Sequence, residues 1–177
     1  MRLNQGFTLI ELITVMLVLG IMAASAAPRF VSLQDDAQAS KVKSVAGAYK
    51  TAVDLAHLKL ISSGRQAPAE NVEVFGKGLL ATLDFNAQGF PSQHFLGANE
   101  ANPTTNNVDD CLSLWRAMMD GGIETQVTHD IAETEKEFLA EYTGDQSCKY
   151  SLISNNKLSF SYDSLTGKVN VDADYTA

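Results

Sequence analysis

A single glutamate lies inside a long apolar run near the start of the chain. Residues 7–27 read FTLIELITVMLVLGIMAASAA, and Glu11 is their only strongly polar side chain. As a helix this run would be about 30 Å long, which matches the hydrocarbon core of a bilayer. An unpaired carboxylate inside such a segment costs a few kcal/mol even on insertion scales. The position of Glu11 therefore predicts a function for its charge.

The other polar side chains do not form a catalytic or metal-binding pattern. Asp109 and Asp110 could offer oxygen ligands to calcium, but their spacing does not resemble an EF-hand loop, and helix capping explains them more simply. GKGLLA at residues 76–81 fits G-x-G-x-x-A, yet a turn and a proline follow too soon for a βαβ unit. No nucleophile motif is present, and the histidines are scattered: His57, His94 and His129. We predict no enzyme activity, metal or cofactor.

The charge and the cysteines restrict the kind of protein further. A formal net charge of −8 argues against a broad nucleic-acid-binding surface. Cys111 and Cys148 are far apart and form no C-x-x-C motif, so they indicate a structural disulfide in an oxidising compartment. The alternative for these two residues is a pair of unbonded buried thiols.

Three interpretations compete for the apolar N-terminal run. An ordinary signal peptide would be cut at an A-x-A site, which residues 24–26 supply. A plain membrane anchor needs only the apolar length, and with Arg2 as the one basic residue ahead of the run, the amino terminus would stay cytoplasmic. Neither of these two interpretations explains Glu11.

The third interpretation rests on the string GFTLIE at residues 6–11, which closely resembles the signature of type IV prepilins, shared by pilins and type II secretion pseudopilins. The resemblance continues through Leu12 and Ile13, then through the small residues Gly20 and Ala23 to Ala27, and through Pro28. It implies that a prepilin peptidase removes residues 1–6 by cleaving after Gly6, and that the peptidase, acting also as an N-methyltransferase, methylates Phe7.

The resemblance also implies how subunits would assemble. The amine of Phe7 keeps its positive charge after methylation, so Glu11 is its expected counter-charge, on its own helix or on the next subunit. Gly20 and Pro28 weaken the helix, and we expect this stretch to be helical in a bilayer and partly unwound in a filament. The implied partners are the peptidase, other pilin subunits, an inner-membrane assembly platform and, before assembly, lipid.

The elements that would position these residues begin with one long helix. We expect residues 7–27 to form its membrane or filament-core half, and residues 28–62 its amphipathic half, packed on a globular head. Apolar residues recur at three- and four-residue spacing from Val42 to Leu60, opposite a face that carries lysines. Ser62-Ser63-Gly64 is the expected end of the helix.

Residues 63–177 are expected to form an α+β head closed by the disulfide. Its N-terminal part suggests strands at 72–75 and 79–85, a turn at 86–89 followed by Pro91, and a polar loop at 97–110. A short helix should start at Asp109 or Asp110 and end at residues 121–122, and residues 133–141 are interpreted as a solvated helical face. The carboxyl end predicts an antiparallel meander with strands at 149–154, 157–162 and 168–172.

The order of these elements, with a long helix first and an antiparallel sheet last, resembles the type IV pilin fold. The spacing from Cys111 to Trp115 is also similar to that of the mannose-sensitive hemagglutinin class of pilins. The expected function is a structural pilin subunit for surface adhesion, first in the bacterial inner membrane and then in an extracellular filament. The alternative is a type II secretion pseudopilin in a periplasmic filament, and the paired cysteines near the carboxyl end favour the pilus.

Overall fold

The computed structural model describes residues 7–76, 82–94, 100–119, 126–133 and 135–173, with only the backbone of residues 27–32. The first element, α1 (Leu9–Ser62), is a helix of 54 residues that passes through Gly20 and Pro28 without a break. It ends where Gly64 adopts a positive φ of 72°, a common helix stop. The predicted helix to about residue 62 is confirmed. The chain divides into two compact units, Met1–Gln38 and Ala39–Ala177.

The second half of α1 belongs to the head and buries one stripe of small and aromatic side chains. Among the α1 residues whose side chains the structure describes, the buried ones begin at Ala39. They recur every three or four positions because 3.6 residues make one turn. They are Ala39, Val42, Val45, Ala46, Tyr49, Ala52, Val53, Ala56 and Leu60.

A small antiparallel sheet follows α1 and contains β1 (Ala69–Glu73), β2 (Thr82–Phe85) and β3 (Pro91–Gln93) in that order. The first strand starts three residues earlier than predicted, and residues 79–81 of the second prediction lie outside the described residues. We did not predict β3, because Pro91 indicated a turn. Proline is tolerated as the first residue of a strand, where its missing N–H costs nothing.

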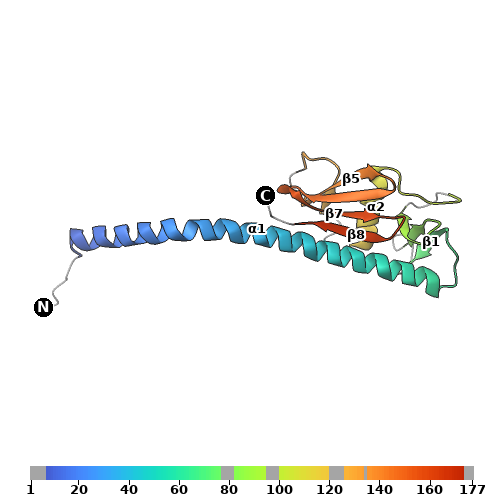
Figure 1. Ribbon diagram of the computed structural model, residues 1–177, viewed down its shortest axis with the longest axis horizontal. Helices are drawn as coiled ribbons and strands as arrows, with labels where there is room; N and C mark the ends of the chain where they lie inside the picture. Colours follow the sequence, from blue (N-terminus) through green and yellow to red (C-terminus); the bar gives the residue numbers. More distant parts are fainter. Residues whose placement is uncertain (1–6, 77–81, 95–99, 120–125, 134, 174–177) are drawn as a thin grey trace. The chain divides into compact units, whose positions relative to one another are not determined.

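The larger sheet contains β4 (Val127–Thr128), β5 (Phe138–Gly144), β6 (Ser147–Leu152), β7 (Asn155–Asp163) and β8 (Lys168–Asp172) in chain order (Figure 1). The antiparallel meander β6–β7–β8 is confirmed. The short β4 pairs parallel to β5, which the sequence analysis did not anticipate.

The expected helical face at residues 133–141 is wrong from residue 138 onward. Phe138 begins β5 and pairs with Leu152 of β6, and Phe138 and Ala140 alternate into the core. The charges around them suggested a solvated helix, but a period of two in the buried residues matches a strand with one face covered. Tertiary pairing with β6 decides the structure here.

The short helix α2 (Val108–Met118) begins with a complete capping box. The side chain of Asn107 accepts a hydrogen bond from the backbone N–H of Asp110, and Asp110 Oδ2 accepts from the backbone N–H of Asn107 at 3.2 Å. The predicted capping role of the acidic pair therefore falls on Asp110, and its pKa is raised because burial outweighs the hydrogen bonds it accepts. The predicted end at residues 121–122 lies outside the described residues.

The core of the head is a cluster of buried aromatic rings between α1, α2 and the larger sheet. Tyr49 of α1 lies 5.4 Å from Tyr150 and 5.5 Å from Phe160 and Tyr162, measured between ring centroids. Trp115 of α2 lies 5.0 Å from Tyr150. Helix α1 therefore packs on the face of the sheet at β6 and β7, and this α+β arrangement confirms the predicted fold class.

The predicted disulfide joins α2 to the sheet within this core. Cys111 of α2 and Cys148 of β6 are bonded, with their Cα atoms 5.5 Å apart and both residues buried. The hydroxyl of Tyr150 donates to the backbone carbonyl of Cys111 at 2.8 Å. The disulfide and this hydrogen bond together hold α2 against β6.

Polar contacts connect the two sheets. Asn86, in the turn after β2, donates through Nδ2 to the backbone carbonyl of Ser164 at 2.6 Å. The hydroxyl of Tyr162 donates to the carbonyl of Pro91 at 2.7 Å. Thr105, in the loop before α2, donates to the carbonyl of Ser92 in β3 at 2.7 Å. These groups are buried, so their hydrogen bonds offset the desolvation of each polar atom.

Candidate assembly segment at the N-terminus

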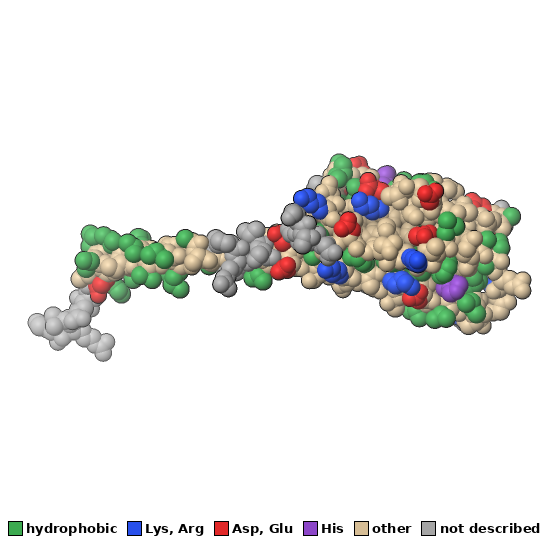
Figure 2. Space-filling model, in the orientation of Figure 1, with side chains coloured by type: hydrophobic (Ala, Val, Ile, Leu, Met, Phe, Trp, Pro, Cys, Tyr) green, Lys and Arg blue, Asp and Glu red, His purple; other side chains and the backbone are tan. Residues whose placement is uncertain are grey.

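The first turns of α1 expose a continuous apolar surface. The segment Leu9–Ala26 has a mean hydropathy of 2.3 and none of it is buried, and it is the one stretch of the described chain that is long and apolar enough to span a membrane. Phe7 is 91% exposed, and apolar side chains line the upper and lower edges of the N-terminal helix in Figure 2. An apolar surface of this extent requires lipid or other apolar helices around it.

Glu11 caps the first turn of α1. Both the backbone N–H and the hydroxyl of Thr8 donate to Glu11 Oε2, at 2.8 Å and 2.7 Å, and the N–H of Glu11 donates back to the Thr8 hydroxyl at 3.3 Å. This is a reciprocal capping box with Thr8 as the N-cap. This capping role was not predicted, although the spacing Thr-x-x-Glu at residues 8–11 is its sequence signal.

The remaining polar side chains of the segment bond to their own helix. Thr14 donates to the carbonyls of Ile10 and Glu11, each at 3.0 Å, and Ser25 donates to the carbonyl of Met22 at 2.9 Å. Hydroxyls bonded in this way do not need water. Glu11 is therefore the one residue of Leu9–Ala26 that brings a charge into an apolar environment.

The other predicted site residues are placed as follows. Gly6 lies outside the described residues. At Gly20 an added Cβ would meet no atom within 4 Å, so the side of the helix there is open in a single chain. The backbone of Pro28 is helical and its side chain is not described.

The described residues of the head offer no comparable candidate site. In the described part of the chain, no group of three or more His, Cys, Asp or Glu side chains is arranged to hold a metal ion. His57 is used within the fold, since its Nδ1 donates to the carbonyl of Gly89 at 2.6 Å and its ring stacks on Phe90.

The N-terminal segment also matches a known family of sequence motifs. Residues 1–27 match the family model described as the prokaryotic N-terminal methylation motif. This chain has a type IV prepilin N-terminus. The match includes the Gly6–Phe7 junction, Glu11 and Gly20, and it ends one residue before Pro28.

Known relatives of this prepilin-type chain are pilus components. It is 46% identical over 52 residues to the type IV narrow pilus major component PilA5 of Thermus thermophilus, covering 29% of this chain and 45% of the relative. It is 42% identical over 52 residues to the type IV major fimbrial protein FimA of Dichelobacter nodosus, covering 29% and 33%. For the type IV major alpha-pilin of Moraxella bovis the values are 43% over 56 residues, covering 32% and 35%.

These similarities span less than half the length of each relative. No solved structure matches the chain at a significant level.

Proposed function

We propose that this chain is a structural subunit of a type IV pilus that assembles into a surface filament through the N-terminal half of α1. The observation that carries the proposal is the fully exposed apolar surface of Leu9–Ala26 with one capping carboxylate at its start. Lipid would cover this surface before assembly, and sibling helices would cover it in the filament. The relatives named above are pilus components, which favours a pilus over a type II secretion pseudopilus.

Cleavage between Gly6 and Phe7 would change the charge of the segment without changing its fold. The N–H of Thr8 that bonds Glu11 is a peptide group before and after cleavage, so the capping box persists. Cleavage adds an α-amine at Phe7, which stays positively charged after methylation. A prepilin peptidase that also methylates, and an assembly platform in the inner membrane, are the partners that these steps require.

Glu11 can form a charge pair that depends on the axial position of a neighbouring subunit. Both hydrogen bonds from Thr8 end on Oε2, and in the described part of the chain Oε1 is left for another donor. An amine that reaches Oε1 would pair two charges in an apolar filament core, where an unpaired carboxylate is costly. A wrong axial stagger leaves the carboxylate unpaired, so Glu11 selects the register of the helices.

The first test is the amino terminus of the mature subunit. Intact-mass measurement and N-terminal sequencing of the purified protein should find N-methylated Phe7. A terminus at Ala27 would instead identify an ordinary signal peptide, and the segment would then be absent from any filament.

The second test separates the counter-charge from the cap. Glu11→Val should leave processing and membrane insertion intact and abolish filaments in electron micrographs. Thr8→Val removes the capping hydroxyl but keeps the carboxylate, so filaments should still form, and Thr14→Val is the control for loss of a hydroxyl elsewhere in the segment. Normal piliation with Glu11→Val would show that the carboxylate is dispensable, and equal loss with Thr8→Val would reduce Glu11 to a cap.

A further inference from the structure

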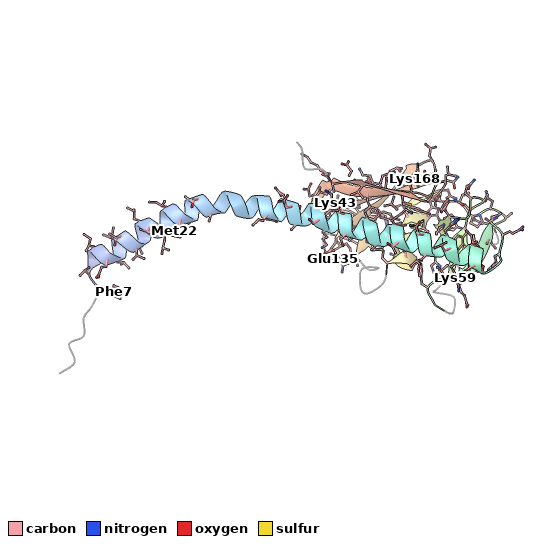
Figure 3. The ribbon with its side chains drawn as sticks, turned by 60° about the horizontal axis from the view of Figure 1, so that its bottom comes forward. Phe7, Met22, Lys43, Lys59, Glu135 and Lys168 are labelled. Carbon is pink, nitrogen blue, oxygen red and sulfur yellow. A yellow bond between two sulfur atoms is a disulfide. The ribbon has the colours of Figure 1, made fainter. Side chains whose placement is uncertain are left out.

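Strand β8 forms one edge of the larger sheet. In the described part of the chain it pairs with β7 on one side and with no strand on the other. In Figure 3, Lys168 at the start of β8 and Glu135 on the other side of the head lie on opposite sides of α1. The side chains of β8 are largely solvent-exposed, including Val171 at 44%. An exposed edge strand is a template for pairing with another chain.

The sequence of β8, Lys-Val-Asn-Val-Asp, is complementary to itself when reversed. In an antiparallel pair centred on Asn170, Lys168 of each copy lies opposite Asp172 of the other, and Val169 lies opposite Val171. In this register, even-numbered residues lie opposite even-numbered residues and odd-numbered residues lie opposite odd-numbered ones. The backbone groups of β8 that point away from β7 would therefore meet the outward groups of the second copy, as a ladder requires.

The two faces of such a pair would also match. Val169 and Val171 lie opposite Tyr162 and Phe160 of β7, which are core residues, so the valines lie on the core side of the sheet. Pairing would place the valines of the two copies together on that side. Lys168, Asn170 and Asp172 would form two ion pairs and a central amide pair on the other side.

We propose that β8 is a homotypic contact surface, which pairs antiparallel with β8 of a second copy about a two-fold axis at Asn170. The charge pattern favours β8 of a second copy, in antiparallel orientation, as the partner. A parallel partner in register would place like charges opposite each other. An antiparallel partner shifted by two residues would lose both ion pairs. Lysine and aspartate on an edge strand otherwise discourage pairing. Here the same charges favour one register over the others.

The two-fold axis determines which molecules can meet in this way. In an extended antiparallel sheet the axis is perpendicular to the sheet, and the head half of α1 lies along its face, as the Tyr49 contacts show. The α1 helices of the two copies would therefore run in opposite directions. Subunits of one filament with parallel helices cannot make this contact, whereas two oppositely directed filaments can. The pairing does not depend on the proposed pilus function.

A single cysteine at the two-fold position gives a direct test. In the full chain with Asn170→Cys, in detergent micelles at about 0.15 M salt to screen the charge of −8 on each copy, oxidation with copper phenanthroline should give a covalent dimer. His129→Cys is the matched control, because His129 is exposed and follows β4 at the opposite end of the sheet. The dimer yield should exceed that of the control on the order of tenfold. Equal yields would overturn the proposal.

Charge reversal tests the register in the same Asn170→Cys chain. Lys168→Asp alone should reduce the dimer yield on the order of tenfold, because it places two pairs of carboxylates together. Adding Asp172→Lys restores opposite charges and should restore the yield. A double variant that stays as low as the single variant, or a single variant that dimerises normally, would refute pairing in this register. Because filaments are not needed, failure of this test leaves the proposed pilus function standing.

Discussion

Gly167, in the turn between β7 and β8, allows a test of how tightly the two sheets are joined. It has a positive φ of 67°, and its backbone N–H donates to the carbonyl of Asp163 at 2.8 Å. A Cβ added here would overlap the ring of Phe90. Gly64 has a similar φ of 72°, but a Cβ there would meet nothing within 4 Å. Both glycines therefore have a positive φ that disfavours other residues, but only at Gly167 would an added Cβ also overlap a neighbouring side chain.

The expected magnitudes follow from these two contributions. Gly64→Ala should destabilise the head by about 1 kcal/mol, because the left-handed region is unfavourable for a residue with a Cβ. Gly167→Ala has the same contribution and a further 1 to 3 kcal/mol, approximately, for overpacking. Phe90 cannot retreat freely, since its ring stacks on His57 at 4.5 Å and His57 is bonded to Gly89.

The assay is urea unfolding of the full chain in detergent, followed by tryptophan fluorescence. Trp115 is the only tryptophan and is buried, so its signal reports the head. Combining Gly167→Ala with Phe90→Ala should remove the overlap, and the double variant should be more stable than the sum of the two single losses predicts. Equal losses for Gly64→Ala and Gly167→Ala would refute the reasoning about the Phe90 contact.

Three further predictions concern the disulfide, the tyrosines and the helix. Replacing Cys111 and Cys148 together by alanine should lower the free energy of unfolding by about 4 kcal/mol in the chain-entropy model for a separation of 37 residues, and a loss under about 1 kcal/mol would contradict it. Burial raises the pKa of Tyr49, Tyr150 and Tyr162 above the ordinary value of 10.0, so the folded head keeps protons that the unfolded chain loses. Stability should therefore fall as pH rises above 10, by about 4 kcal/mol per pH unit for three tyrosines. Phenolate absorbance from these tyrosines without loss of the folded Trp115 fluorescence would show that they are accessible. Gly20→Ala with Pro28→Ala should stiffen α1 and make filaments less extensible under force, and unchanged force-extension curves would count against a weak point in the helix.

The sequence predicts those parts of the structure whose signal is local and regular. The apolar stripe from Val42 to Leu60 has a helical period, and the meander after Cys148 alternates with a period of two, so both were recognised. Residues 138–141 were wrongly predicted as helix because charged residues precede them and Glu141 lies on the open face of β5. Their strand conformation depends on pairing with β6, which no local pattern encodes.

The candidate site was predictable in its residues and only partly in its contacts. Glu11 was identified because one charge in an apolar run is expensive. Its hydrogen bonds with Thr8 follow from a Thr-x-x-Glu capping motif. This motif was overlooked because Glu11 was interpreted only as a counter-charge. The polar contacts between the sheets, such as Asn86 with Ser164, join residues 78 apart in the chain and have no sequence signature.

The hydrogen-bonded pair of Tyr49 and Tyr150 joins residues 101 apart in the chain, with the hydroxyls 3.2 Å apart. During synthesis, α1 would emerge from the ribosome long before β6 and β7, the strands that cover the apolar stripe of α1. Tyr49 and its neighbours would therefore stay uncovered until β6 and β7 had been synthesised. Such a delay favours capture by chaperones or proteases.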